Sequence, residues 1–389
     1  MSLHREPVPL VLAGARGHGR KHLDTIRRLA LSGRVRLAGI CELTPLSGAE
    51  LDGFGAPEQS TDLTALLRST GARVVVISTP IHTHTALALS AAEHGAHVLL
   101  EKPPAPSYAE FQRLADGIEA AGIAVQVGFQ SLGSHAIDAI RDLVADGVIG
   151  DVLGIGAAGP WTRDEAYFRR APWAGHRRLN GDDVVDGVLT NPLAHAVATA
   201  LALDGSTGAG DIEAIETELF RAHDIEADDT SYVAITTTAG RRIGVAATLC
   251  AEHPDEPYVV VHGSRGRVTF WYKQDRVLVQ RSGHGPEESF HGRTDLLVNL
   301  LDHLEGRAAL LVPLRATAAF MRVVEAVRDA PDPARLPPKA WMRVTDEEGS
   351  ARRVVHGIDA LVAACADTLD GFGALGAPWA GAPKEADAL

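Results

Sequence analysis

Apolar residues in the first third of the chain form short continuous runs, and longer segments of helical periodicity separate these runs. The runs lie at 8–13, 34–42, 73–79, 97–101 and 123–129. Continuous apolar runs of this length are typical of parallel strands that are covered on both faces. Because strands and helices alternate, the pattern predicts an α/β fold with a doubly wound parallel sheet. Ligands of such sheets bind beyond the carboxyl ends of the strands.

The pattern changes after residue 130. Strand-length segments of mostly alternating hydrophobicity then follow one another, and glycine-containing turns such as 238–240 are typical of hairpins. We therefore predict three regions: the doubly wound domain over 1–130, an α+β domain with a largely antiparallel open sheet over 131–330, and a C-terminal helical extension over 331–389 that packs back on the domains.

Composition and charge narrow the class of protein. The 389 residues are 46% hydrophobic and 22% charged, which is ordinary for a globular protein with a sizeable core. The formal net charge of -13 disfavours nucleic acid and anionic membranes as partners, since both are bound by clustered basic residues. The three cysteines lie far apart, and we find neither a membrane-length apolar run nor a signal peptide. We expect a cytoplasmic protein.

A glycine-rich segment, "GARGHG", directly follows the first predicted strand. The dinucleotide-binding fingerprint has glycines at its first, third and sixth places. Gly14 and Gly19 fill the first and sixth, whereas Arg16 holds the third with Gly17 beside it. A helical segment follows, and Glu42 ends the second predicted strand 23 residues after Gly19. This context favours a dinucleotide site over the alternative, a tight turn without a cofactor.

The same residues bear on the choice of dinucleotide. An acid at the end of the second strand accepts hydrogen bonds from the ribose hydroxyls of NAD and repels the 2′-phosphate of NADP. Glu42 is such an acid, and no arginine occurs in the "LTPLSG" segment after it. We therefore predict NAD, with NADP the less favoured alternative because the Arg16 side chain is long enough to reach a phosphate.

The fourth predicted strand ends in charged residues, because "HVLL" runs directly into Glu101 and Lys102 and then two prolines. Charges at the end of an apolar strand are costly unless they are paired, solvated or used. On these residues alone, a surface ion pair of Lys102 is the simplest interpretation.

A longer stretch around this strand resembles a known family. The stretch "STPIHTHTALALSAAEHGAHVLLEKPPAPSYAEF" contains Thr79-Pro80, then His84, a helical segment, and Glu101-Lys102-Pro103. This order resembles the Gfo/Idh/MocA (glucose-fructose oxidoreductase / inositol dehydrogenase) oxidoreductases, and the resemblance extends over about residues 8–329. One departure is Ile81, where many members have Asn near the nicotinamide.

The resemblance implies an N-terminal Rossmann domain, a bound NAD and a role for Lys102. This lysine would polarise the reacting oxygen and stabilise the negative charge that develops as hydride leaves. The resemblance also implies a cis peptide bond before Pro103. The predicted cofactor-binding residues are Gly14, Arg16, Gly17, Gly19, Glu42, Thr79, Pro80, His84, Glu101 and Lys102.

A second candidate site lies in the segment "TNPLAHAVATALAL". Asn191 followed by proline predicts the N-cap of a helix, and His195 lies four residues on. The resemblance places a substrate-binding Asp at the position of Asn191 and makes His195 the general base. A helix N-terminus favours the neutral imidazole, which is the form that accepts a proton. The alternatives are a plain N-cap for Asn191 and a core histidine for His195.

Aromatic and basic residues are interleaved between 159 and 181. Flat rings suit the C–H face of a sugar, and guanidinium groups suit hydroxyls or a carboxylate. From this segment we select Trp173 and His176 as substrate-binding candidates, with a packed loop or a subunit contact as the alternative. The closely spaced pairs His82/His84 and His94/His97 lack an evident third ligand, and we predict no metal site.

Together these observations favour an NAD-dependent dehydrogenase. We expect oxidation of a secondary alcohol of a sugar, inositol or polyol, in a homodimer or homotetramer formed through the C-terminal sheet, as the resemblance implies. One alternative is an enzyme that keeps and recycles its NAD during elimination, glycoside cleavage or sugar oxidoreduction. Another is a non-catalytic dinucleotide or sugar sensor. The substrate itself does not follow from the sequence.

Overall fold

The computed structural model describes residues 6–347 and 349–381. The chain divides into two compact units. The first unit comprises residues 1–128 and 295–314, and the second comprises 129–294 and 315–389. The first boundary lies two residues from the predicted one. The segment 295–314, which the sequence placed in the second domain, groups with the first unit.

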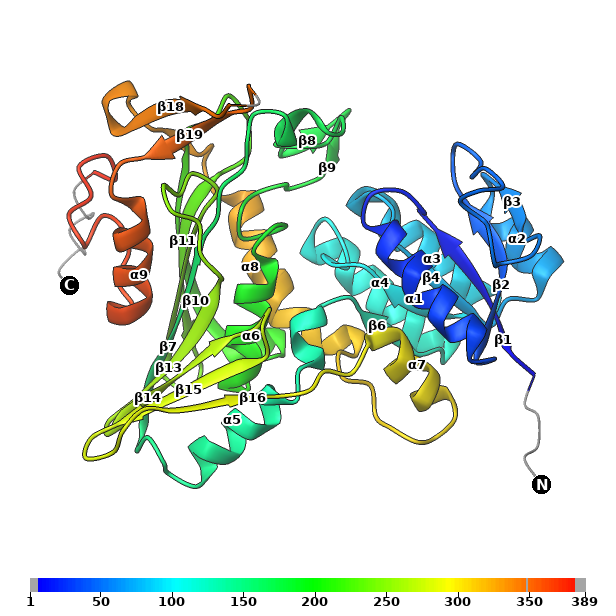
Figure 1. The fold of residues 1–389 in the computed structure, drawn as a ribbon, viewed down its shortest axis with the longest axis horizontal. Helices are drawn as coiled ribbons and strands as arrows, with labels where there is room; N and C mark the ends of the chain where they lie inside the picture. Colours follow the sequence, from blue (N-terminus) through cyan, green and yellow to red (C-terminus); the bar gives the residue numbers. More distant parts are fainter. Residues whose placement is uncertain (1–5, 348, 382–389) are drawn as a thin grey trace. The chain divides into compact units, whose positions relative to one another are not determined.

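The first unit contains a six-stranded sheet in the order β3-β2-β1-β4-β5-β6, and every neighbouring pair is parallel. The order reverses between β1 and β4, which is the switch point where ligands bind in such sheets. The predicted doubly wound parallel sheet is confirmed (Figure 1). Its strands are β1 (Val8–Ala13), β2 (Val35–Cys41), β3 (Glu58–Ser60), β4 (Val74–Ile77), β5 (His97–Leu100) and β6 (Val125–Val127).

Helices connect these strands and bury their apolar faces on the sheet. The helix α4 shows how the local sequence fixes an element: the Ser107 hydroxyl accepts a hydrogen bond from Glu110 N at 3.2 Å, and Gly122 closes the helix at a φ of 66°. The helices of this unit are α1 (Gly19–Leu31), α2 (Leu63–Thr70), η1 (Ile81–Thr83), α3 (His84–Glu93), α4 (Tyr108–Ala121) and α7 (Leu296–Leu304).

Hydrogen bonds explain why the segment 295–314 returns to the first unit. Gln126, on β6, is completely buried, and its Nε2 donates to Asn299 Oδ1 at 2.6 Å. Gln126 Oε1 accepts from Val312 N at 2.9 Å, and the Val127 amide donates to Val312 O at 2.9 Å. A buried amide side chain is costly unless its polar atoms are paired, so this set stabilises the segment on the sheet edge.

The second unit is built on a nine-stranded sheet in the order β16-β15-β14-β13-β7-β12-β11-β10-β17. Only β7/β12 and β10/β17 pair in parallel, so the predicted largely antiparallel sheet is confirmed. Its strands are β7 (Val152–Pro160), β10 (Ile212–Arg221), β11 (Thr230–Thr237), β12 (Arg242–Thr248), β13 (Tyr258–Gly263), β14 (Gly266–Trp271), β15 (Arg276–Arg281), β16 (Glu287–Phe290) and β17 (Ala334–Arg335).

Helices and small strand pairs complete this unit. They are η2 (Gln130–Gly133), α5 (Ala136–Ala145), η3 (Tyr167–Arg169), β8 (Arg178–Leu179), β9 (Asp182–Asp183), α6 (Ala194–Asp204), η4 (Ala209–Asp211), η5 (Leu314–Thr317, beginning at the unit boundary), α8 (Ala318–Asp329), η6 (Pro338–Ala340), β18 (Trp341–Thr345), β19 (Ala351–Val355) and α9 (Ile358–Thr368). Among the residues that the structure describes, no helix has the length and apolar character of a membrane span.

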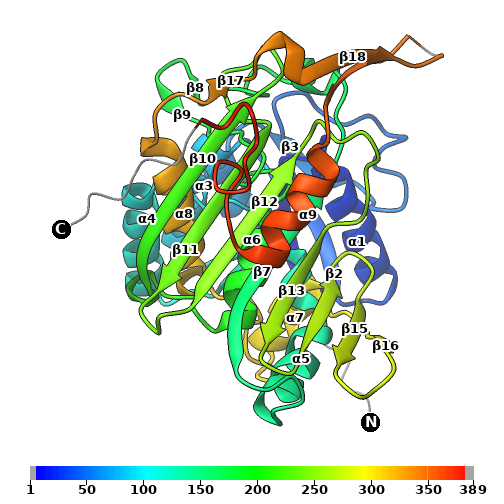
Figure 2. The same ribbon diagram turned by 90° about the vertical axis from the view of Figure 1, so that its left-hand side faces the viewer.

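The C-terminal helix α9 packs against β7 and β12 of the large sheet (Figure 2). The backbones approach closely, because a Cβ atom on Gly156 of β7 would lie 1.8 Å from Ala366 O, and one on Gly154 would lie 2.4 Å from Leu369 Cδ1. Tyr232 and Arg242 both donate to the carbonyl oxygen of Leu369, at 2.5 and 2.9 Å. The helix α9 is therefore an integral layer of the second unit, whereas residues 382–389 of the predicted extension lie outside the described residues.

Candidate active site

The glycine-rich turn between β1 and α1 is shaped by close backbone contacts. Gly14 has a φ of 81°, and a Cβ atom there would lie 2.5 Å from Ser78 O at the end of β4. A Cβ atom on Gly19 would lie 2.0 Å from Gly14 O. These two positions therefore require glycine. Gly17 has a φ of 56°, and a Cβ atom there would meet nothing within 4 Å, so this part of the turn is open.

The Glu42 carboxylate lies beside this turn. Its Oε2 accepts a hydrogen bond from Ala15 N at 2.9 Å, and its Oε1 accepts one from Leu43 N at 2.9 Å. The carboxylate thus joins the end of β2 to the turn after β1, at the carboxyl edge of the sheet. The open turn and this acid fit an NAD molecule whose ribose approaches Glu42.

Arg16 lies over the loop that follows β2. Its guanidinium forms an ion pair with Glu50 at 3.3 Å and donates to the carbonyl oxygens of Thr44 and Pro45 at 3.3 and 3.2 Å. The Arg16 side chain is 40% exposed. The sequence predicted a cofactor contact for Arg16, and the structure places its charge at the loop beyond Glu42.

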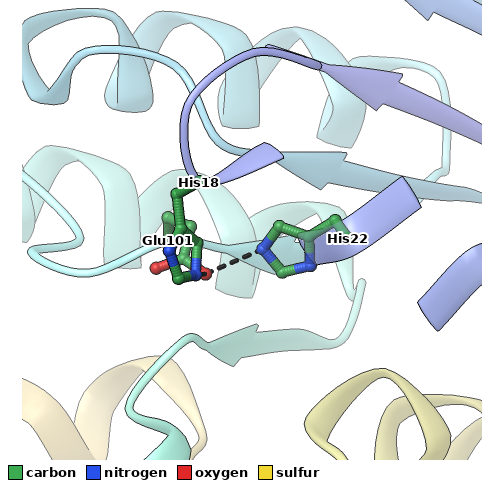
Figure 3. Close-up of side chains that lie close together, drawn as sticks. All are labelled: His18, His22 and Glu101. Atoms are coloured by element: carbon green, nitrogen blue, oxygen red, sulfur yellow. Dashed lines mark hydrogen bonds and ion pairs between the residues drawn. The ribbon is translucent and has the colours of Figure 1, made fainter. Parts of the chain in front are cut away.

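Two imidazoles from the turn and α1 meet the Glu101 carboxylate (Figure 3). His22 Nε2 lies 2.8 Å and His18 Nε2 lies 3.3 Å from Glu101 Oε1, and Lys102 N donates to Glu101 Oε2 at 3.2 Å. Burial acts to raise the pKa of this carboxyl group. Hydrogen bonds from His18 and His22 outweigh burial, so the pKa of Glu101 lies well below its usual range. The sequence predicted Glu101 but neither histidine, although both flank the last glycine of the fingerprint.

Lys102 lies two residues after Leu100, the last residue of β5, at the carboxyl edge that also carries the glycine-rich turn. The peptide bond between Lys102 and Pro103 is cis, as the family resemblance implied. Lys102 is partly exposed, whereas Glu101 before it and Pro103 after it are buried. The structure thus places the lysine at the edge of the sheet where ligands of doubly wound folds bind.

His84 connects the segments after β4 and β5. Its Nδ1 lies 2.8 Å from Pro103 O and its Nε2 lies 2.9 Å from Thr79 O, while the Thr79 hydroxyl contacts Thr83 Oγ1 at 2.6 Å. Pro80 is exposed and precedes η1. Burial lowers the pKa of His84. We conclude that His84 joins the backbone that follows β4 to the backbone directly after Lys102.

In the second unit, the prediction for Asn191 needs correction. The helix α6 begins at Ala194, and its N-cap is Leu193 instead of Asn191. Asn191 Nδ2 instead donates to Asp186 Oδ1 at 2.5 Å. Leu193 N donates to Val188 O, and the helix begins at Ala194, two residues after Pro192, so the proline does not occupy the first helical position.

His195 lies in the first turn of α6, as predicted, and is partly buried. Its Nδ1 lies 3.3 Å from Ser131 Oγ, and Thr199 donates to the same Ser131 oxygen at 2.9 Å. The ring packs edge-on against Phe129 with centroids 5.8 Å apart, and the Tyr272 ring lies at 6.4 Å. This polar contact on one side and aromatic packing on the other fix the plane of the imidazole.

Asp186 is a site residue that the sequence analysis missed. Its carboxylate is buried, accepts from Gly175 N at 2.7 Å, and forms an ion pair with Arg170 at 3.5 Å, in addition to its bond with Asn191. The Arg170 guanidinium lies 4.6 Å from the Trp173 ring centroid. Arg170 and Asp186 thus connect the Trp173 ring to the Asn191 side chain through consecutive contacts. The available signal was an aspartate five residues before Asn191.

His176 makes a different contact. Its Nδ1 lies 3.1 Å from Glu226 Oε2, and the two side chains are 41% and 55% exposed. The structure therefore does not join the His176 ring to the Asp186–Asn191 pair.

In the pairs His82/His84 and His94/His97, three of the four imidazoles, those of His84, His94 and His97, contact backbone atoms. His94 Nδ1 lies 2.9 Å from Ser90 O, and His97 Nδ1 accepts from Ala124 N at 2.9 Å. Across residues 6–347 and 349–381, two other groups have metal-ligand spacing: His18/His22/Glu101 and His223/Asp229/Cys250.

The sheet order, the glycine-rich turn and the acid after β2 define an NAD-binding Rossmann domain that is followed by a mixed-sheet α+β unit. Residues 10–129 match the model for the oxidoreductase family with an NAD-binding Rossmann fold, and residues 132–269 match the Gfo/Idh/MocA C-terminal domain. The chain belongs to the Gfo/Idh/MocA family. The predicted family, fold class and NAD-binding domain are confirmed.

Several curated relatives are named as dehydrogenases or as a reductase. The chain is 24% identical over 257 residues to levoglucosan dehydrogenase from Pseudarthrobacter phenanthrenivorans, covering 60% of this chain and 65% of that protein. It is 26% identical over 271 residues to dTDP-3,4-didehydro-2,6-dideoxy-alpha-D-glucose 3-reductase from Streptomyces violaceoruber, covering 68% and 70%. The chain thus spans slightly less than two thirds of the first relative's length.

Solved structures share the fold at low sequence identity. The WlbA dehydrogenase from Bordetella pertussis, in complex with NADH and UDP-GlcNAcA, has a TM-score of 0.68 and 21% identity, covering 82% of this chain and 95% of that one. An inositol dehydrogenase homolog from Azotobacter vinelandii, complexed with NAD+, has a TM-score of 0.67 and 18% identity, covering 82% and 94%. These neighbours are almost fully matched, whereas this chain has additional residues.

Proposed function

We propose that this protein is an NAD-dependent dehydrogenase that oxidises a secondary alcohol of a sugar, inositol or polyol. The observation that carries the proposal is Lys102 at the carboxyl end of β5, on the same sheet edge as the glycine-rich turn and Glu42. An ammonium group at that edge is suited to polarise a substrate oxygen. The sugar-derived names of the curated relatives support this class of substrate.

The dinucleotide would be held by the open glycine-rich turn and by Glu42. When bound, NAD supplies the acceptor for the hydride that leaves the substrate carbon. Glu42 faces the ribose hydroxyls in this proposal, which favours NAD over NADP. Gly14 and Gly19 keep the turn close to the sheet, and His84 holds the backbone around Lys102.

We assign one role in the reaction to Lys102 and one to His195. Lys102 binds the alcohol oxygen and stabilises its developing negative charge, and His195 takes the hydroxyl proton as general base. In the tautomer that donates from Nδ1 to Ser131 Oγ, His195 Nε2 carries the accepting lone pair. Asn191 and Trp173 remain our candidates for orienting the substrate, with Asp186 fixing the amide of Asn191. His176 is retained as a weaker substrate-binding candidate.

The test is NADH formation, followed by absorbance, over a panel that includes levoglucosan, myo-inositol and free and nucleotide-linked sugars. Lys102→Ala and His195→Ala are measured beside wild type, with the exposed residues Lys21→Ala and His356→Ala as matched controls. We expect kcat losses of about 10²–10⁴-fold in both site variants and little change in the controls. Turnover by wild type with full rates in both site variants would refute the assignments.

A second candidate function keeps the NAD bound and returns it to its starting state. A 2,7-anhydro-N-acetylneuraminate hydratase from Mediterraneibacter gnavus is 33% identical over 93 residues, which are 24% of this chain. Its name denotes a reaction without net oxidation. Product formation by wild type in the panel without net NADH absorbance, detected by mass spectrometry, would favour this candidate. Dinucleotide binding without any product would instead point to a sensor.

The predicted assembly through the C-terminal sheet also needs a test. The α9 helix occupies the sheet face over β7 and β12, so that part of the sheet offers no open surface to a second copy. We propose that any homodimer or homotetramer forms through other surfaces.

A further inference from the structure

Three ligating side chains converge beside the glycine-rich turn. His18 immediately precedes α1, and His22 lies in the first turn of that helix, four residues on. Residues four apart lie on one face of a helix. Glu101 reaches the pair from the end of β5, so its Oε1 lies 2.8 Å from His22 Nε2 and 3.3 Å from His18 Nε2. Figure 3 shows the two rings directed at the carboxylate.

The carboxylate of Glu101 is buried, which is an unusual position for an acidic group. The Glu101 side chain is only 9% exposed, and its Oε1 lies within 3.3 Å of the Nε2 atoms of both histidines. A buried carboxylate requires a compensating positive charge or strong hydrogen bonds. Two imidazole nitrogens and one carboxylate oxygen are also the donor set that zinc and neighbouring divalent metals bind in proteins.

We propose that His18, His22 and Glu101 form a binding site for a divalent metal of the zinc class. Zinc bonds of about 2.0–2.1 Å with tetrahedral angles separate neighbouring ligand atoms by roughly 3.3 Å. The observed nitrogen–oxygen separations of 2.8 and 3.3 Å require only small shifts to reach this spacing. His18 is 48% exposed, which provides an entry path and leaves room for water as a further ligand.

The second group with metal-ligand spacing is a poorer candidate. Asp229 is completely buried and already accepts hydrogen bonds from the Ala222 and His223 amides, at 2.9 and 2.8 Å to its Oδ2. Cys250 is completely buried as well, and burial raises the pKa of its thiol well above the usual value. Thiolate formation and metal entry are both unfavourable there.

The test is titration of metal-free protein with Co²⁺ alone, without dinucleotide, followed by visible absorption, and competition by Zn²⁺. We expect one equivalent of Co²⁺ with nitrogen and oxygen ligation, and no near-ultraviolet charge-transfer band from a thiolate. Since loss of even an outer-shell partner weakens metal binding by about tenfold or more, His18→Ala should weaken it at least that much. The exposed His356→Ala is the matched control and should bind as wild type does.

Three outcomes would overturn the proposal: no binding by wild type, equal binding by wild type and His18→Ala, or a thiolate charge-transfer band, which would point to Cys250. A second measurement covers the case that a variant fails to fold. Imidazole proton resonances of wild-type protein should shift for two histidines on Zn²⁺ addition, and folded His22→Gln or His18→Ala protein should lose one shifted set. Shifts of other histidines would contradict the assignment.

Discussion

At the residue scale, Glu101 shows how a buried charge can stabilise the glycine-rich turn. Its carboxylate accepts from two imidazoles of the turn and α1 and from its neighbouring amide. Replacement by the isosteric amide in Glu101→Gln removes the charge and leaves mismatched donors. We expect the free energy of unfolding to fall by about 1.5–3 kcal/mol. Chemical denaturation measures this loss, and Glu93→Gln on the exposed surface of α3 is the control.

The same group predicts how stability depends on pH. The pKa of Glu101 is lower in the folded protein than the value of about 4.3 for an unperturbed glutamate. Its contribution is therefore fully present above that unfolded value and is lost as pH falls through the folded pKa. The difference in unfolding free energy between wild type and Glu101→Gln should shrink as the pH falls below about 4. A constant difference down to pH 2 would contradict this account.

Glu42 and Arg16 predict a change in cofactor preference. Glu42 lies beside the turn, and the Arg16 guanidinium lies over the loop that follows β2. In Glu42→Ala the repulsion of a 2′-phosphate is lost while the arginine remains, so the affinity ratio of NADPH to NADH should rise about tenfold or more. Fluorescence titration with both reduced dinucleotides measures the ratio. Adding Arg16→Ala should reverse the gain, and an unchanged ratio in both variants would argue against these roles.

Several of these residues were predictable because their signals are local. Gly14 and Gly19 match a fingerprint that reflects close backbone contacts. The role expected for Lys102 came instead from the family resemblance, because its local sequence alone favoured a surface ion pair. Asn191 was misassigned as an N-cap because an Asn-Pro pair satisfies the local rule. The Asn191 side chain instead donates to the buried Asp186 carboxylate. The N-cap rule does not take this contact into account. The aspartate is visible five positions before Asn191, but the backbone path that brings the two side chains together is not.

At the element scale, the close packing of α9 on β7 predicts that a larger side chain in place of a β7 glycine lowers the stability of the protein. A Cβ atom on Gly156 would lie 1.8 Å from a backbone oxygen of α9, which cannot rotate away. Gly156→Val should therefore destabilise the protein by about 1–3 kcal/mol or more through overpacking. Thermal unfolding checks this expectation. Gly285→Val is the control, because a Cβ atom at Gly285 meets nothing within 4 Å, and equal stability of the two variants would contradict the packing account.

The elements themselves were predictable to different degrees. Buried parallel strands have continuous apolar runs in their sequence, and these runs predicted the first sheet. The return of 295–314 to the first unit depends on Gln126 pairing with Asn299, and the two lie 173 positions apart in sequence. No local pattern indicates that pair. Gly154 and Gly156 inside β7 did carry a signal, since a glycine within a strand often marks the close approach of another backbone.

At the scale of the whole molecule, α9 and the residues that follow it cover one face of the large sheet, and this cover predicts how the protein associates. The cover includes Phe372 and Trp379, whose rings pack on Phe220 of β10 with centroids 6.1 and 4.7 Å away. Tyr232 and Arg242 bind the end of α9 through Leu369 O. Because one chain supplies both sides of this packing, its formation does not require a second copy.

Hydrogen exchange of the full chain over a hundredfold dilution range tests this point. Amides of α9, β7 and β12 should keep the same protection at every concentration, since protection that arises within one chain does not follow mass action. Light scattering on the same samples reports the mass of the particle. If an oligomer forms through other surfaces, dilution should lower the mass while the protection of α9 stays the same. Protection of α9 and β12 that falls together with the mass would show instead that a second copy supplies the cover.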